Sequence, residues 1–154
     1  MTVHQERLLK NVPIYKLQLV REKTVEYKNR IMITSPKQLY DFAWPFFEDS
    51  CVEKMVLVLL NTSNHVIGVS TISTGGLDSS IVEPRMIFKP AMDANAACFI
   101  ITHNHPSNGL EPSKEDKLTT KKIAEAGHIM GIHMRDHVIV TDNGYTSMAE
   151  RGFI

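Results

Sequence analysis

Two dense apolar runs set the strongest limit on how this chain of 154 residues can fold. The runs lie within EKMVLVLLN (residues 53–61) and AACFIIT (residues 96–102), and each has the length of a strand. A strand with one face in water alternates apolar and polar side chains, whereas a strand covered on both faces is apolar throughout. The runs therefore predict strands inside the protein, and the second is expected to be buried.

Local signals place elements before and beside the first run. Turn residues NTSN follow it and a β-like pattern then resumes, so residues 53–73 are expected to form a hairpin. Upstream, Ser35 followed by Pro36 is typical of a helix start, and Pro45 should end or kink that helix. Short alternating patterns at residues 15–20 and 30–34 predict two earlier strands.

Further helices and strands are predicted on either side of the second run. Residues 84–96 suit a short helix that Pro90 could break. After residue 113 a longer helix is expected, with Gly127 and Gly131 softening its end, because semi-polar or apolar residues recur at helical spacing at Thr119, Ile123, Ala126 and Met130. Residues 133–142 predict a strand, DNGY a turn, and residues 146–153 a short terminal helix.

Length and charge narrow the class of protein. The chain has the size of one compact domain, with no internal repeat, so residues 1–154 are expected to form a single domain. Seventeen basic and seventeen acidic residues give a net charge of zero, which does not favour binding to nucleic acid or anionic lipid. A local patch at Lys117, Lys121 and Lys122 keeps DNA binding as an alternative, although a solvated helix face explains these lysines as well.

Cysteine usage and the N-terminal sequence predict the compartment. Cys51 and Cys98 are the only cysteines, and without a CxxC pair they indicate neither a disulfide framework nor a thiolate zinc site. No apolar segment is long enough for a signal peptide or a membrane span. A cytoplasmic protein without membrane contact is therefore expected.

The stretch THNHPSNGLEPSKED (residues 102–116) holds the strongest candidate for chemistry. Alternate residues of a strand point to the same face, so His103 and His105 should converge at the end of the second run. A catalytic zinc ion needs a third protein ligand and an open position. Ser113 and Asp116 form a capping-box pattern at the start of the next helix, and from there Asp116 could also reach back to the strand end.

The spacing of these residues resembles the H-x-H-x7-S-x2-D motif of the JAMM (MPN) metalloprotease family. Within that family, HNHPS and the later DHVIV (residues 136–140) are similar to the RadC branch. The resemblance covers roughly residues 50–154 and only weakly residues 1–50, which are expected to be an extension with strands and one helix. Longer RadC relatives carry an N-terminal helix-hairpin-helix region suited to DNA, which this chain is expected to lack.

The resemblance implies a fold, a metal and a reaction. The fold would be of the α/β class, a three-layer α/β/α sandwich with a mixed sheet between the helices, as in JAMM/MPN and cytidine-deaminase-like proteins. His103, His105 and Asp116 would bind Zn²⁺, Glu53 would be the general base, and Ser113 would help to stabilise the oxyanion. The activity would be hydrolysis of a peptide or isopeptide bond in a protein or peptide whose identity the sequence does not name.

Several alternatives stay open at this point. Glu83 and Glu111 compete with Glu53 for the role of base, and Glu53 could simply be a surface residue at a strand end. Relatives usually have a glutamate where this chain has Met86, and SNGLEP (residues 107–112) replaces their S-G-D-P-T-P loop. The first change removes a carboxylate that is not among the implied ligands, and the second keeps the ligand spacing.

The other histidines are weaker candidates for metal binding. His65, His128 and His133 are expected to be structural or exposed. Asp136 and His137 are neighbours on a predicted strand and face opposite ways, so both cannot point at one metal ion, and we expect them to be support or core residues. The main alternative function is a DNA-associated accessory or interaction module with a vestigial or structural zinc site. The oligomeric state and the pathway are not determined by the sequence.

Overall fold

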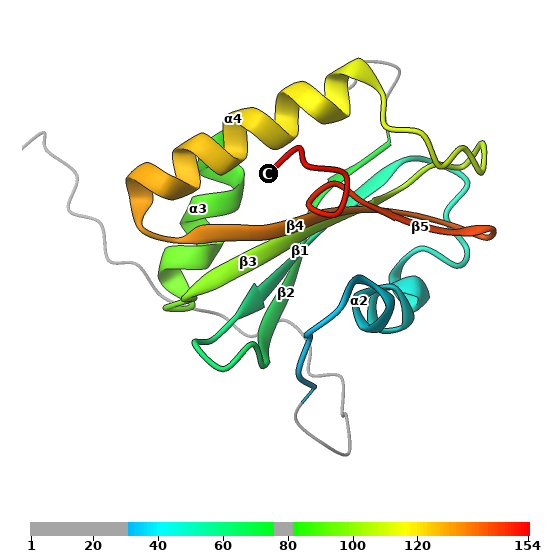
Figure 1. Ribbon diagram of the computed structural model, residues 1–154. Helices are drawn as coiled ribbons and strands as arrows, with labels where there is room; N and C mark the ends of the chain where they lie inside the picture. Colours follow the sequence, from blue (N-terminus) through cyan, green and yellow to red (C-terminus); the bar gives the residue numbers. More distant parts are fainter. Residues whose placement is uncertain (1–30, 76–81) are drawn as a thin grey trace, which may run out of the picture.

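A mixed five-stranded sheet is the centre of the fold in the computed structural model, which describes residues 31–75 and 82–154 (Figure 1). Its order is β2-β1-β3-β4-β5, and only β3 and β4 are parallel neighbours. The strands are β1 (Lys54–Leu60), β2 (Val66–Thr74), β3 (Cys98–Asn104), β4 (His133–Thr141) and β5 (Gly144–Ser147). The expected α/β fold with a mixed sheet is confirmed.

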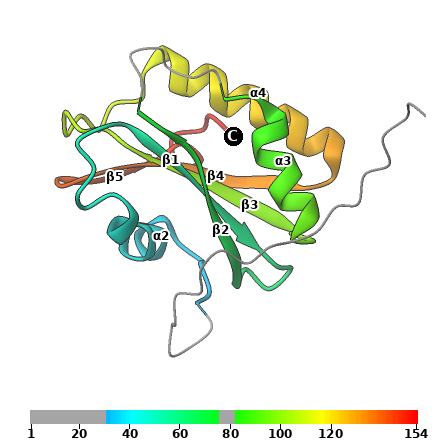
Figure 2. The same ribbon diagram turned by 180° about the vertical axis from the view of Figure 1, so that it is seen from behind.

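Helices cover both faces of this sheet (Figures 1 and 2). Helix α2 (Pro36–Ala43) and the short 3-10 helix η1 (Trp44–Phe46) lie on one face, and α3 (Pro84–Asp93) and α4 (Lys114–Met130) lie on the other. None of the helices in the described part of the chain is long and apolar enough to cross a bilayer.

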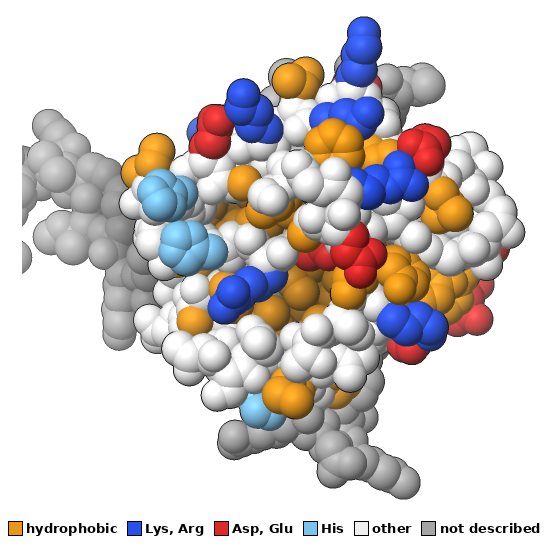
Figure 3. Space-filling model, viewed as in Figure 1, with side chains coloured by type: hydrophobic (Ala, Val, Ile, Leu, Met, Phe, Trp, Pro, Cys, Tyr) orange, Lys and Arg blue, Asp and Glu red, His pale blue; other side chains and the backbone are white. Residues whose placement is uncertain are grey.

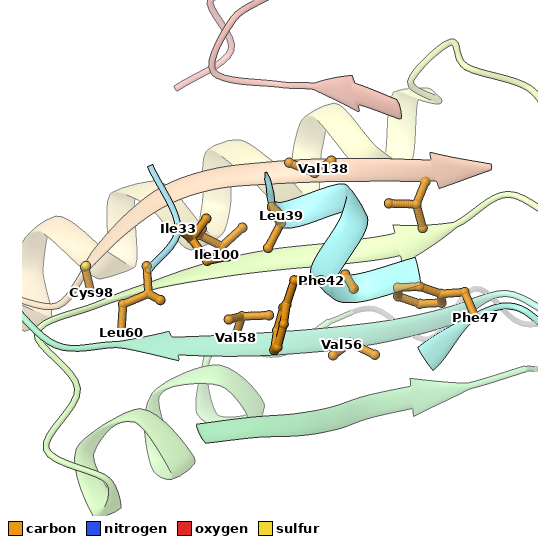
Figure 4. Packing of buried hydrophobic residues seen from close by; sticks show 12 residues of the cluster. Ile33, Leu39, Phe42, Phe47, Val56, Val58, Leu60, Cys98, Ile100 and Val138 are labelled. Atoms are coloured by element: carbon orange, nitrogen blue, oxygen red, sulfur yellow. The ribbon is translucent and has the colours of Figure 1, made fainter. Parts of the chain in front are cut away.

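Each face of the central strands packs into its own apolar core. Val56, Val58 and Leu60 of β1 point toward α2, where they meet residues such as Leu39 and Phe42 (Figure 4). The alternate residues of β1 (Met55, Leu57 and Leu59) join the cluster under α3 and α4. Because both faces are buried, the strands have no room for the polar alternation of a surface sheet, which explains the two apolar runs.

The hairpin and the first helix agree with the sequence patterns. Strands β1 and β2 pair antiparallel, as expected for residues 53–73. Ser35 caps α2, since its side-chain oxygen accepts a hydrogen bond from the backbone N–H of Gln38 at 3.3 Å. The α-helix ends at Ala43, two residues before Pro45, and η1 follows it. Residues 15–20 lie outside the described residues. Of the strand expected at residues 30–34, the described part (residues 31–34) contributes only a single bridge, from Met32 to His65.

Three details differ from the sequence-based expectation. Helix α3 continues through Pro90 to Asp93, because its buried face (Ile87, Phe88 and Ala91) holds it against the sheet. The terminal helix expected at residues 146–153 is wrong: Thr146 and Ser147 belong to β5 and pair with β4, and turns follow them. The buried face of α4 is also rotated, toward Thr120, Ile123 and Gly127, so that Met130 is exposed.

The topology brings three distant segments to one edge of the sheet. Strand β3 leads through α4 to its parallel neighbour β4, so the C-terminal end of β3 lies near the start of α4. Strand β1 runs antiparallel to β3, and Met55 pairs with His103. The residues just before β1 therefore lie beside the end of β3.

Candidate metal centre

Two histidines and an aspartate converge where β3 ends and α4 begins. His103 is fully buried on the α3/α4 face of β3, and His105 follows just beyond the strand. Asp116 lies in the first turn of α4 and is 7% exposed. His103 Nε2 is 3.0 Å from His105 Nε2 and 3.1 Å from Asp116 Oδ1, and His105 Nε2 is 3.4 Å from Asp116 Oδ2.

Glu53 completes a group of four possible ligands. Its Oε1 is 3.9 Å from His103 Nε2, and one ligand atom from each of the four residues lies within 4.8 Å of the others. Unlike His103, the Glu53 side chain is 58% exposed, so it approaches the group from the solvent side. Among residues 31–75 and 82–154, no other cluster of three or more such side chains has this geometry.

The side chain of Asn104 holds the backbone on both sides of Glu53. Its Nδ2 donates to the carbonyl of Val52 at 3.1 Å, and its Oδ1 accepts from the N–H of Lys54 at 2.7 Å. The carbonyl of Glu53 itself accepts from the N–H of Gly75 at 2.7 Å. This part of the site was missed by the sequence analysis, although Asn104 stands between the two histidines of HNHP.

The two competing glutamates are engaged elsewhere. Glu111 forms an ion pair with Arg151 at 2.8 Å, and Glu83 lies 3.8 Å from Lys122. Neither belongs to the group of four. Met86, the residue that departs from the family pattern, is half-buried in the first turn of α3 and is also not in the group.

A capping box fixes Asp116. The N–H of Asp116 donates to Ser113 Oγ at 3.0 Å, and the N–H of Ser113 donates to Asp116 Oδ2 at 2.8 Å. Asp116 can therefore cap the helix and face the metal site at the same time, because Oδ2 accepts the capping hydrogen bond while Oδ1 points at His103. The oxyanion role of Ser113 stays a prediction.

The loop between His105 and Ser113 is braced by the β4–β5 hairpin. Asn108 and Asp142 exchange two hydrogen bonds of 3.1 Å, and Thr146 Oγ1 donates to the carbonyl of Leu110 at 2.7 Å. Within the loop, His105 Nδ1 lies 2.7 Å from the carbonyl of Gly109. The SNGLEP sequence thus forms a fixed loop that orients the His105 ring.

Two buried polar residues, His137 and Thr120, lie behind His103. His137 is fully buried, and its Nε2 is 2.8 Å from His103 Nδ1. On its other side, His137 Nδ1 is 2.7 Å from Thr120 Oγ1, and this hydroxyl donates to the carbonyl of Asp116 at 2.7 Å. The sequence predicted that His137 is a support or core residue, but not that it contacts His103.

Asp136 faces away from the site, as the alternation of a strand requires. Its carboxylate accepts hydrogen bonds from Ser147 Oγ at 2.6 Å and from the N–H of Ala149 at 3.0 Å. A bulge at Arg135 determines which residues of β4 face α4. Met134 pairs with Phe99 but Asp136 pairs with Ile100, so Arg135 is an extra residue in β4. Without the extra residue, His137 would point to the α2 face of the sheet.

Burial and hydrogen bonding shift the pKa values of the group. Burial alone would raise the pKa of Asp116, but hydrogen bonds from His103 and His105 hold it well below its usual range. The hydrogen bond to Asp116 raises the pKa of His105. Burial lowers the pKa of His137 to about 3, so this ring is neutral at pH 7. The centre therefore holds an ionised carboxylate beside a buried neutral ring.

This donor set fits a divalent metal ion. Two imidazole nitrogens and one carboxylate oxygen, all converging on one point, are a usual set of protein ligands for catalytic zinc. His103, His105 and Asp116 would be the ligands, and the more exposed Glu53 would lie beside the open position. Three other histidines of the described residues lie outside the group: His65 is half-buried, and His128 and His133 are exposed with ring centroids 5.9 Å apart.

Comparison with known proteins identifies the family. The profile of the family described as "RadC-like JAB domain" matches residues 33–153, which includes all four residues of the candidate centre. The chain belongs to the RadC-like JAB domain family. The resemblance to the RadC branch is confirmed.

Relatives of this RadC-like JAB domain include UPF0758 proteins of bacteria. One from Staphylococcus aureus (strain bovine RF122 / ET3-1) is 46% identical over 125 residues, which cover 81% of this chain and 55% of the relative. Another from Salinibacter ruber (strain DSM 13855 / M31) is 46% identical over 125 residues, or 81% of this chain and 54% of the relative. The RadC-like JAB chain thus spans just over half the length of these relatives.

Proposed function

We propose that the chain is a zinc-dependent hydrolase that cleaves peptide or isopeptide bonds. The observation that supports this proposal is the convergence of His103 Nε2, His105 Nε2 and the Asp116 carboxylate: the two nitrogens are 3.0 Å apart, and a different carboxylate oxygen lies 3.1 Å from the first and 3.4 Å from the second. The family includes metallohydrolases of the JAMM type, and the donor set is the one that such an activity requires.

A bound zinc ion would supply Lewis-acid chemistry and would lower the pKa of a coordinated water to about 7. Glu53 would take the proton from the attacking water and deliver it to the leaving amine as the carbon–nitrogen bond breaks. Its position suits this role, because its carboxylate borders the ligand group but is open to solvent.

Ser113 would hold the oxygen of the substrate carbonyl. Its Oγ accepts a hydrogen bond from the N–H of Asp116, which leaves the hydroxyl proton free to donate. A donor at this place would stabilise negative charge as it develops on the carbonyl oxygen. The same hydroxyl would therefore cap α4 and contact the substrate.

Substitution of Glu53 tests this assignment. Glu53→Gln should keep the metal content of the wild type and lose turnover by roughly 10²–10⁴-fold, since it removes the base without removing a ligand. Metal content and peptide hydrolysis are measured on the same preparation, with a peptide library and with isopeptide-linked peptides, before and after chelation.

Asp116→Ala is the matched comparison, because it should lose metal and activity together. Glu53→Gln with wild-type activity would remove Glu53 from the mechanism. The alternative, a DNA-associated accessory module, predicts a different result. The wild-type protein would then bind zinc, hydrolyse no peptide or isopeptide, and bind DNA equally well with and without zinc.

A further inference from the structure

A continuous line of hydrogen bonds connects the backbone of α4 to the ring of His103. It runs from the carbonyl of Asp116 through Thr120 Oγ1 to His137 Nδ1, and from His137 Nε2 to His103 Nδ1. All three links measure 2.7 or 2.8 Å, and Thr120, His137 and His103 are all fully buried. Buried groups without access to water must satisfy one another, so the proton positions along the line are coupled.

The direction of each hydrogen bond follows from the end of the line. A carbonyl oxygen can only accept, so the single proton of the Thr120 hydroxyl is committed to Asp116. Thr120 Oγ1 must then accept from His137 Nδ1–H. A neutral imidazole carries one proton, so His137 Nε2 is an acceptor and receives Nδ1–H of His103.

We infer that Thr120 and His137 are positioning residues that keep a proton on Nδ1 of His103. Nε2, which lies beside His105 and Asp116, is then the ring nitrogen that is left to bind a metal ion. The metal-binding part of this inference rests on the proposed function, but the proton on Nδ1 does not. Because Thr120 and Asp116 share the first turns of α4, the same helix would supply one ligand and orient another.

The proton on Nδ1 can be measured without any metal. Nitrogen-15 NMR of the chelator-treated wild-type protein at mildly alkaline pH should show His103 with a protonated Nδ1. An Nδ1 that carries no proton, or carries it in only part of the molecules, would overturn the inference. This result holds whether or not the protein turns out to bind zinc, so it separates a failure of the inference from a failure of the proposed function.

Two substitutions at Thr120 distinguish positioning from packing. Thr120→Val keeps the shape but removes the hydroxyl, and it should lower zinc affinity by about 10–100-fold and leave Nδ1 of His103 protonated in only part of the molecules. Thr120→Ser keeps the hydroxyl but removes a buried methyl group, and it should retain both the affinity and the proton on Nδ1.

A residue that acted only through packing would give the reverse pattern, with the serine variant impaired and the valine variant close to wild type. Zinc affinity is measured by competition with a chromophoric chelator, and urea unfolding of both variants reports their stability. If Thr120→Val fails to fold, the protonation of His103 Nδ1 in the wild type and in Thr120→Ser still decides between the two roles. Equal zinc affinity in the valine variant and the wild type would overturn the positioning role.

Discussion

At the scale of single residues, the candidate centre combines groups that stabilise one another only when they are together. Asp116 remains ionised although it is 7% exposed, because two imidazoles and a capping N–H face it. Burial has the opposite consequence for the charge of His137. Its ring stays neutral in the folded protein, whereas in water it would take up a proton near pH 6.5. The sequence could indicate the ligands by their spacing, but not the network behind them, which depends on contacts between residues 17 and 34 positions apart.

His137 should make the metal-free protein less stable as the pH falls. Its ordinary pKa is 6.5 and its pKa in the folded protein is about 3. Below pH 6.5 the unfolded chain therefore binds a proton that the folded chain does not, and stability should fall by up to about 1.4 kcal/mol per pH unit. Urea unfolding of chelator-treated protein at pH 6.5 and pH 5 measures this slope.

The control for this pH dependence is His137→Gln, which has a neutral side chain at every pH. Other groups titrate in both proteins, including Asp116, whose lowered pKa places its own loss of stability at more acidic pH. The slope should therefore be smaller in the variant. The same slope in both proteins would show that the His137 ring is protonated in the folded state.

At the scale of elements, α4 does most to assemble the site. Its capping box fixes Asp116, its second turn carries Thr120, and its end is closed by Gly131 in a left-handed conformation with φ of 67°. The sequence predicted this helix and its start, because caps are local signals. It did not predict which face is buried, since a face with threonine and glycine gives a weak apolar stripe.

Gly127 and Gly131 should respond differently to alanine. A Cβ at Gly127 would lie 2.8 Å from the carbonyl oxygen of Ile132, so Gly127→Ala should destabilise by roughly 1–3 kcal/mol although alanine favours a helix. A Cβ at Gly131 meets nothing within 4 Å, and Gly131→Ala should cost only about 1 kcal/mol, from the strain of positive φ. Urea unfolding compares the two, and a more stable Gly127→Ala would contradict the close packing of α4 on the start of β4.

The short strand β5 illustrates the limit of sequence patterns at this scale. The segment 146–153 was expected to be a helix, yet Thr146 and Ser147 pair with Ile139 and Val138. A four-residue strand shows too little alternation to be recognised. Its pairing partner is set by the turn at residues 142–143 and by the packing of Met148, which is fully buried. Long-range contacts override local preference in such a segment.

At the scale of the whole molecule, the sheet order explains why distant residues meet. The parallel neighbours β3 and β4 place the end of β3 beside the start of α4, and antiparallel β1 brings Glu53 to the same edge. Local patterns predicted most of the strands and helices, and the resemblance to the JAMM family implied how they are layered, whereas the bulge at Arg135 could not be inferred from periodicity alone. Charge is balanced over the chain, and acidic and basic side chains are interspersed on the face in Figure 3. The proposed hydrolysis would therefore depend on the side chains at this one edge and not on a long-range electrostatic field of the whole protein.

The most direct test of the account is the metal content of the purified chain and of two histidine variants. The wild type should bind one zinc ion per chain, and His103→Ala should bind almost none because it removes a buried ligand. His128→Ala is the matched control, since His128 is exposed and lies outside the group of four, and it should bind as much zinc as the wild type. A wild-type protein that takes up no divalent metal, or a His103→Ala variant that binds zinc as tightly as the wild type, would contradict the proposed centre.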